Sequence, residues 1–405
     1  MTSEDPMDRR RPRRHAPTLA GEGAGGPYWR FILLALLSLV CITTATAQAP
    51  APVNQAVIAA ERPPELLSAY HFFRDAGAHE PNERVTPYDL NTPLYSDGAL
   101  KFRYVFIPPG QQAQYRDEGV FEFPVGTVLI KTFAFAADMR QPTENVRFLE
   151  TRLLIRRAEG WIALPYVWNE AQTEARLSPI GATIPVSFTN EQGQAIALDW
   201  AVPNRNQCKG CHDVAGEFTP IGPNARNLNR AGPEIAVSPW SEGNVSALIP
   251  RSDPISTNQL DAWTDDHLLA GAPPGADAPR APRAFDPASG SLDLRARAYL
   301  DVNCAHCHNP QGPAHTSGLD LRWSQHDPIA WGVGKRPVAA GRGSAGFEFA
   351  IDPGHPERSI LLYRLRATDP GVMMPETGRQ LVDERGAALI EDWIAHMDSE
   401  GRVHE

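Results

Sequence analysis

Polar and apolar positions alternate through the middle of the chain, which predicts a β-rich region. Residues 101–106 alternate polar and aromatic side chains, and residues 128–135 and 146–156 form two further strand-like runs. A turn at residues 158–160 predicts a hairpin after the last of these runs. The pattern continues through residues 183–188 and 195–202. It predicts an antiparallel, sandwich-like domain, which we place at residues 68–203.

Apolar positions recur with helical spacing in two segments nearer the C-terminus. One helix is predicted by Leu292, Ala296, Tyr299 and Leu300. A second helix, capped by Asp383, has an apolar face made of Leu389, Ile390, Trp393, Ile394 and Met397. The predicted fold class is multidomain: the mainly-β domain is followed by mainly-α modules at residues 204–270 and 288–400. Residues 271–287, rich in Pro, Gly and Ala, predict a linker between the two modules.

The N-terminus has the pattern of an export signal. Six arginines precede an apolar run at residues 31–42, and small residues follow it. The run is shorter than the about 20 apolar residues of a membrane span. We therefore predict a signal peptide at residues 1–47 and a periplasmic protein. An uncleaved N-terminal membrane anchor is the alternative, and only then do we expect contact with a membrane.

Charge and cysteine content narrow the function further. The chain of 405 residues has a net charge of −10. The full chain has 38 basic and 48 acidic residues, and residues 1–47 contain 6 and 4 of them. Without this segment 32 basic and 44 acidic residues remain, which gives a net charge of −12. An acidic chain is a poor partner for nucleic acid. Of the 5 cysteines, Cys41 lies in the predicted signal, so four remain.

All four remaining cysteines fall into two copies of the motif C-x-x-C-H. The copies are Cys208, Cys211, His212 and Cys304, Cys307, His308. Two thiols at this spacing can bond the two vinyl groups of one porphyrin, and the next histidine then binds its iron. Two covalently attached haem c groups are therefore predicted.

Other sites built from cysteine pairs fit these residues less well. A four-cysteine zinc site normally has its pairs about 15–20 residues apart. Here 92 residues separate Cys211 from Cys304. A thioredoxin-like redox site needs a βαβ context, and structural disulfides give no reason for a histidine after each pair.

The remaining iron ligands are less evident from the sequence. The segment from Ser291 onward resembles the single-haem cytochrome c domain, in which a Met-Pro loop supplies the sixth ligand. This resemblance implies Met374, with Met373 as the alternative, and it implies that Tyr299 meets the second helix on its Trp393 side. No methionine lies between Met139 and Met373. For the first haem, His267 is a candidate for the sixth ligand. The alternatives are His71, His79, His315 and His326, or an open iron with no sixth ligand from the protein.

From residue 88 to 394 the chain resembles a family of exported dihaem c-type cytochromes of undefined reaction. The matching strings lie at residues 88–97, 126–133, 150–154, 168–175 and 220–223. The resemblance implies electron transfer with a periplasmic redox partner protein. The alternative is a dihaem peroxidase-like or oxidase-like enzyme, with an open first haem and the second as electron relay. A catalytic β domain is a third possibility, although this region has no HExxH motif and no nucleophile elbow.

Overall fold

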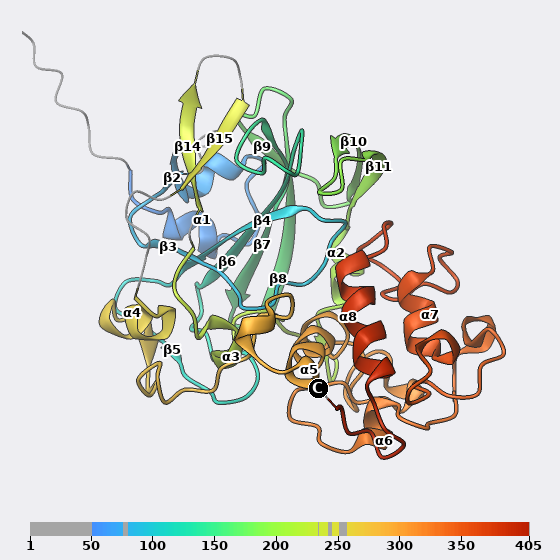
Figure 1. Ribbon diagram of the computed structural model, residues 1–405. Coiled ribbons are helices and arrows are strands. Elements are labelled where there is room, and N and C mark those ends of the chain that lie inside the picture. Colours follow the sequence, from blue (N-terminus) through green and yellow to red (C-terminus); the bar gives the residue numbers. More distant parts are fainter. Residues whose placement is uncertain (1–50, 76–79, 234, 242–244, 251–256, 405) are drawn as a thin grey trace, which may run out of the picture. The chain divides into compact units, whose positions relative to one another are not determined.

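The computed structural model describes residues 51–75, 80–233, 235–241, 245–250 and 257–404. The predicted export signal at residues 1–47 lies outside the described residues. So does His79, one of the candidate haem ligands. Residues 50–405 form one compact unit. Its first part is rich in β structure and its last part contains a few helices (Figure 1).

An eight-stranded antiparallel sheet is the central element of the β-rich part. Its main order is β14-β15-β7-β6-β4-β3, and β8 pairs with both β7 and β9. The strands at 101–106, 128–135 and 146–156 are confirmed as parts of β4, β6 and β7, and the hairpin at 158–160 joins β7 to β8. The strands are β3 (Val85–Tyr88), β4 (Leu100–Phe106), β6 (Val128–Ala136), β7 (Val146–Arg157), β8 (Gly160–Trp168), β9 (Ala175–Leu177), β14 (Ile235–Ser241) and β15 (Val245–Pro250).

Both faces of this sheet are covered. Tyr104 and Ile130 pack in one apolar cluster, while their neighbours Val105 and Leu129 pack in another. Side chains alternate between the two faces of a strand, so the two clusters lie on opposite sides of the sheet. A sheet buried on both faces explains why these strands contain so many consecutive apolar residues.

A two-stranded hairpin forms the second β layer. It consists of β10 (Ala182–Thr189) and β11 (Ala195–Val202). Phe188 stacks on Phe135 with ring centroids 4.5 Å apart, and Trp200 lies 5.4 Å from Phe133. The expected sandwich is thus one large sheet covered in part by a hairpin. Only every second residue of β11 is buried at its C-terminal end, so this strand packs on one side only.

Residues 204–270, predicted as a helical module, contribute to the sheet as well. Their helices are short: α2 (Arg205–Lys209), α3 (Ala225–Leu228) and α4 (Gln259–Asp265). The β14–β15 hairpin from the same stretch joins the sheet where Ser246 pairs with Val146. Small strand pairs complete this part, namely β1 (Phe73–Asp75) with β2 (Glu80–Pro81), β12 (Asp213–Val214) with β13 (Glu217–Phe218), and β5 (Ala113–Gln114) with β16 (Leu269–Ala270).

The stretch predicted as a linker, residues 271–287, packs against the preceding segment. The Asn229 side chain donates to the carbonyls of Gly275 and Ala278 at 2.8 and 2.9 Å. Ala278, Ala281 and Ala284 are all buried. Small side chains let this Pro-rich stretch lie close to its neighbours, so its composition reflects close packing here.

The C-terminal part contains both predicted helices. They are α5 (Leu292–Asn303) and α8 (Glu384–Ala395), and Asp383 caps α8 by accepting from Gly386 N at 2.9 Å. The Tyr299 hydroxyl donates to Asp383 at 3.0 Å, whereas Trp393 donates to Asp293 at 2.9 Å. Tyr299 therefore contacts α8 at its start, and it belongs to the same apolar cluster as Trp393. Shorter helices in or before this part are α1 (Gln55–Ala59), α6 (Pro328–Trp331) and α7 (Ile360–Arg366), with 3-10 turns η1 (Leu67–Tyr70), η2 (Pro287–Ser289), η3 (His315–Ser317), η4 (Gly341–Ser344) and η5 (Pro356–Arg358).

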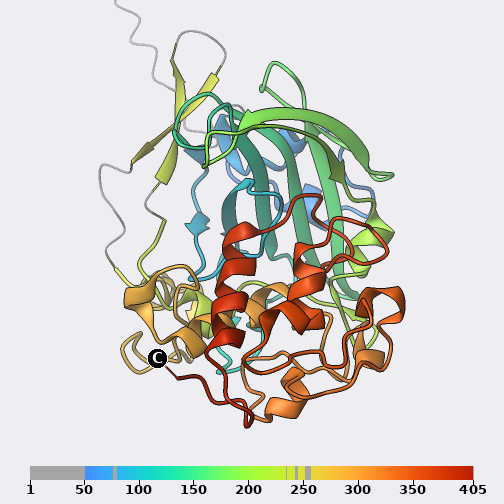
Figure 2. The same ribbon diagram turned by 45° about the vertical axis from the view of Figure 1, so that its right-hand side comes forward.

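A segment before β4 joins the β-rich part to the C-terminal helices. Tyr95 N donates to the buried Asn303 side chain at 2.8 Å, and Tyr95 OH donates to Val382 O at 3.1 Å. One oxygen of Asp97 accepts from the backbone N–H groups of Gln380 and Leu381, both at 2.7 Å. These bonds hold the orange-to-red C-terminal helices beside the sheet in both views (Figures 1 and 2).

The contact between α5 and α8 leaves no room for a side chain at Gly386. A Cβ there would overlap the Tyr299 phenol and come within 2.6 Å of Asp383 Oδ2. We expect Gly386→Ala to lower the free energy of unfolding by about 1–3 kcal/mol, measured by denaturant unfolding. In a Tyr299→Ala background the same change should cost less, because the overlap with the phenol is gone and alanine favours the helix by about 1 kcal/mol, although the close approach to Asp383 remains. An equal loss in both backgrounds would contradict this contact.

Candidate functional site

The first C-x-x-C-H motif begins in α2 and continues into the turn after it. Asn204 caps α2 by accepting from Gln207 N, and the Gln207 side chain bonds back to Asn204 N. This capping box starts the helix close to Cys208. After the helix, Cys211 N and His212 N both donate to Cys208 O, at 3.3 and 3.1 Å. The motif is therefore a single tight turn with its side chains half-buried.

The second motif has the same backbone arrangement at the end of α5. Cys304 follows the last helical residue, and Cys307 N and His308 N both donate to Cys304 O, at 3.1 and 2.9 Å. Burial raises the pKa of the Cys304 thiol to about 12. Two segments distant in the sequence thus share one local fold, which brings two thiols and an imidazole into the same turn.

Each motif histidine is held through one ring nitrogen. His212 Nδ1 lies 2.9 Å from Thr219 O, and the ring stacks on Phe218 with centroids 5.1 Å apart. His308 Nδ1 lies 3.0 Å from Ser317 Oγ. Burial lowers the pKa of both imidazoles to about 4, which favours the neutral form that binds metals.

The second ring nitrogen of these histidines is available to iron. Nε2 of His212 and of His308 has no hydrogen bond to any residue that the structure describes. A metal-binding histidine usually donates through its other nitrogen to a fixed acceptor, which sets the tautomer and the ring orientation. The thiols and imidazoles of both motifs therefore fit a covalently attached haem.

The fold brings the two motifs into contact. Cys307 Sγ lies 3.8 Å from Gly210 O, and Ala215 N donates to Gln311 O at 3.0 Å. The interaction between the two thiols lowers the pKa of Cys211 and raises that of Cys307. The motifs are thus adjacent in space although 92 residues separate Cys211 from Cys304.

The loop that contains Met373 and Met374 lies against both motifs. Thr377 Oγ1 is 3.9 Å from Cys211 Sγ. The charge of Arg364, together with burial, lowers the pKa of His308. The Arg364 side chain donates to Val372 O at 2.8 Å, and its backbone carbonyl accepts from Met374 N at 2.9 Å. Met373 is buried and Met374 is half-buried. This placement is compatible with the predicted ligand Met374, which stays a prediction.

The candidate ligands for the first iron lie in exposed positions. His267 is exposed after the end of α4, where its φ is 56°. His315 and His326 are exposed too. No hydrogen bond or ion pair connects any of these three side chains to the first motif among the residues that the structure describes. None of them therefore gains support as the sixth ligand.

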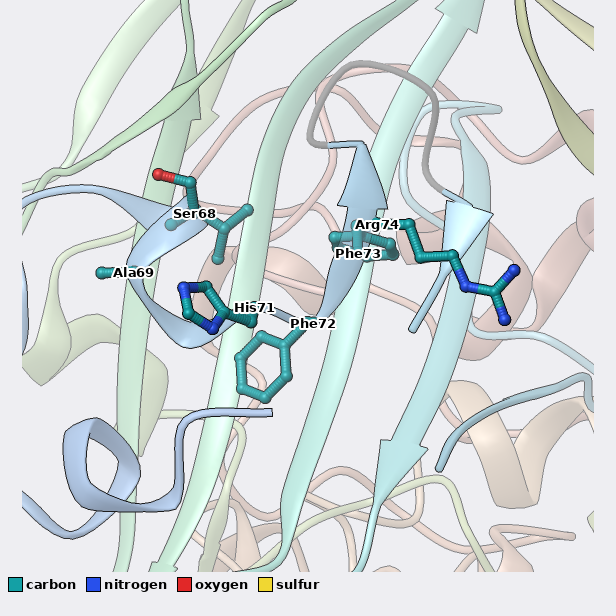
Figure 3. A pocket seen from close by; sticks show the side chains of 7 residues that line it. Ser68, Ala69, His71, Phe72, Phe73 and Arg74 are labelled. Atoms are coloured by element: carbon teal, nitrogen blue, oxygen red, sulfur yellow. The ribbon is translucent and has the colours of Figure 1, made fainter. Parts of the chain in front are cut away.

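His71 lies on the other side of the sheet. It lines a cavity of about 320 Å³ together with Ser68, Phe73 and Arg74 (Figure 3). The neighbouring Tyr70 belongs to the cluster of Tyr104 and Ile130, the face opposite Val105 and Leu129. His71 Nδ1 lies 3.1 Å from Pro52 O. This cavity is separate from the two motifs.

A second cavity opens beside the first motif. Its volume is about 460 Å³, and Asn204, Arg205 and Lys209 from α2 and its cap line it. Phe218, which stacks on His212, also lines this cavity. The Phe218 ring therefore lies between this cavity and His212, the histidine of the first motif.

Sequence reasoning assigned no role to three basic residues inside the sheet. Arg103, Lys131 and Arg152 occupy paired positions on β4, β6 and β7. The available signal was the lysine in the mostly apolar string GTVLIKTF and the first arginine in the string ETRLLIRR. Their pairing depends on strand register, which the alternation of single strands does not reveal.

Comparison with known proteins adds no relative. No family model matches the chain, and no curated protein or solved structure matches it. Within the described ranges no three His, Cys, Asp or Glu side chains are grouped to hold a metal ion. A haem iron takes only one protein ligand on each face, so it needs no such group. None of the helices in those ranges has the length and apolar character to cross a membrane.

Proposed function

We propose that this chain is an exported dihaem c-type cytochrome that carries electrons through two covalently attached haems. The observation that carries the proposal is the contact between the two C-x-x-C-H motifs, which contain every cysteine of the predicted mature chain. Residues 204–270 and 288–400 are then the two haem c modules. The predicted export signal supports a periplasmic location, where covalent haem attachment takes place.

The motif residues have defined roles in this proposal. Cys208 and Cys211 anchor one haem and Cys304 and Cys307 the other, through thioether bonds. His212 and His308 bind iron through Nε2, each oriented by the bond at its Nδ1. Met374 is the sixth ligand of the second iron. When bound, haem iron alternates between ferric and ferrous states and supplies the one-electron chemistry.

The contact between the motifs supports transfer from one haem to the other. The bonds from Gly210 and Ala215 to the second motif hold the two attachment turns together. With both haems bound, electrons would enter at one haem and leave by the other. The cavity beside α2 and the β-rich part offer a docking surface for a periplasmic redox partner protein.

A second candidate function is a dihaem peroxidase-like or oxidase-like enzyme. The observation that favours it is the exposed position of His267, which leaves the first iron without a supported sixth ligand. An open iron binds small molecules, and the second haem would then act as an electron relay.

Covalent haem is the first experimental test. Protein matured in an export-competent, cytochrome-maturing host is expected to keep its haem stain after denaturing electrophoresis. The matched variant in which all four motif cysteines are replaced by alanine should lose the stain. Absence of stain from the unaltered protein would overturn the proposal.

Carbon monoxide distinguishes the two candidate functions. Two low-spin, six-coordinate haems should leave the spectrum of the reduced protein unchanged when carbon monoxide is added, which supports electron transfer. A change equivalent to one haem would instead favour the enzyme with an open first iron.

A further inference from the structure

Three basic side chains form a row across the central sheet. In the antiparallel register, Arg103 of β4 lies opposite Lys131 of β6, and Lys131 lies opposite Arg152 of β7. Opposed residues project from the same face of a sheet. Lys101, two residues before Arg103, projects from this face too. We call these four residues the cationic row.

This arrangement is unfavourable without an anion. Like charges directly opposite each other destabilise a sheet. Arg103 pairs with Asp89 at 3.1 Å, but Arg230 binds the same carboxylate, also at 3.1 Å. Arg152 pairs with Glu150 at 2.6 Å. The two carboxylates are thus already used by three arginines.

Neither lysine of the row has an ion pair with a residue that the structure describes. Lys101 Nζ donates to Ala99 O at 3.2 Å. Lys131 Nζ lies 4.7 Å from the centre of the Phe133 ring, and it has neither a hydrogen bond nor an ion pair with any described residue. Asp97, in the segment before β4, and Asp383, the cap of α8, act on Lys101. One oxygen of Asp97 already accepts from two backbone N–H groups, and the two oxygens of Asp383 accept from Gly386 N and from the Tyr299 hydroxyl.

Both lysines are half-buried, and this partial burial makes their ammonium groups costly. Desolvation, followed by repulsion from Arg103, lowers the pKa of Lys101 to about 7. Desolvation and the neighbouring Arg103, Lys101 and Arg152 lower the pKa of Lys131 well below its ordinary value. A buried cation is stable only when it is paired. A carboxylate in contact with the row would restore the charge of both lysines.

The cationic row lies beside the first motif. Glu150, the partner of Arg152, accepts from Trp200 Nε1 at 2.8 Å, and Trp200 lies near the end of β11, the strand that leads into α2 and Cys208. Burial and the charge of Lys131 both lower the pKa of His212. A haem carries two propionate carboxylates, and Arg and Lys are the side chains that bind carboxylates best. Two carboxylates match the two ammonium groups that have no ion pair among the described residues.

We propose that the cationic row binds the propionate carboxylates of the haem attached at Cys208 and Cys211. This inference rests on the haem attachment proposed above. The row then neutralises the propionates inside the protein and places positive charge beside the first iron. Positive charge disfavours the ferric state, so the row raises the reduction potential of this haem.

The test uses Lys131→Met in the full, haem-loaded protein, with Lys131→Arg as the conservative variant. Arg74→Met, which removes one cation from the opposite side of the sheet, is the matched control. Potentiometric titration should show a lower midpoint potential for one haem in Lys131→Met. Resonance Raman spectra should show a shifted propionate bending mode in the same variant. Lys131→Arg and Arg74→Met should keep both values, and every variant should keep two haems.

Several outcomes would overturn the inference. If the Lys131→Met protein is loaded with both haems and neither value changes, the row does not bind propionate. A change of the first haem from low to high spin would identify Lys131 as an iron ligand instead. Two results together would indicate a site for a free carboxylate instead. The potential of Lys131→Met would shift while its propionate mode stays unchanged, and added acetate would alter the potential of the unmodified protein. If Lys131→Met does not fold, Lys101→Met gives the same comparison. Loss of haem from the unmodified protein refutes the proposed function itself.

Discussion

The double substitution Cys304→Ser and Cys307→Ser is expected to lower covalently bound haem from about two to about one per chain. In the proposed dihaem protein each C-x-x-C-H motif holds its own haem, so removing one pair of thiols should leave the other attachment intact. The haem content is measured as pyridine haemochrome against protein concentration. Serine preserves the size of the side chain, which keeps the turn at the end of α5 close to its present packing.

The matched control is the double substitution Cys208→Ser and Cys211→Ser. It should remove the other haem, and the two variants should have different absorption spectra and midpoint potentials. After a rapid one-electron pulse, only the unmodified protein should show a second kinetic phase from transfer between haems. Equal haem content in all three proteins would contradict the attachment of one haem to each motif.

The substitution Met374→Ala is expected to abolish the weak far-red sulfur-to-iron band of the oxidised protein. Loss of a thioether ligand also lowers the reduction potential and opens the iron, because methionine raises the potential of haem. The reduced variant should therefore bind carbon monoxide at the second haem. Absorption spectra and a redox titration measure these effects.

The neighbouring methionine provides the control for this assignment. Met373 is 7% exposed, and Met373→Leu keeps its volume and apolar character. This variant should retain the far-red band. A band that survives Met374→Ala and disappears in Met373→Leu would assign the ligand to Met373.

The strands and the two long helices could be predicted from the sequence, because their signals are local. Alternation at residues 101–106 identified β4, and the apolar positions from Leu389 to Met397 identified α8. The helix cap at Asp383 was equally local. Such signals depend only on which side of one element is buried.

The arrangement of the site could not be predicted, because it depends on contacts between distant segments. Nothing in either motif indicates that Gly210 touches Cys307. The β14–β15 hairpin joins the sheet through one pair, Ser246 with Val146, and this pairing has no signature in either strand. The cationic row required the register of three strands to be known together.

The bonds of Asp97 also determine when this molecule can finish folding. Its carboxylate accepts from Gln380 and Leu381, which lie 283 and 284 residues later in the chain. A chain that crosses a membrane from its N-terminus cannot make these bonds until almost all of it has emerged. Contacts this distant close large loops and slow folding. In the proposed exported cytochrome, both thiol pairs would therefore remain accessible for a period after synthesis, and that interval would be the time available for haem attachment.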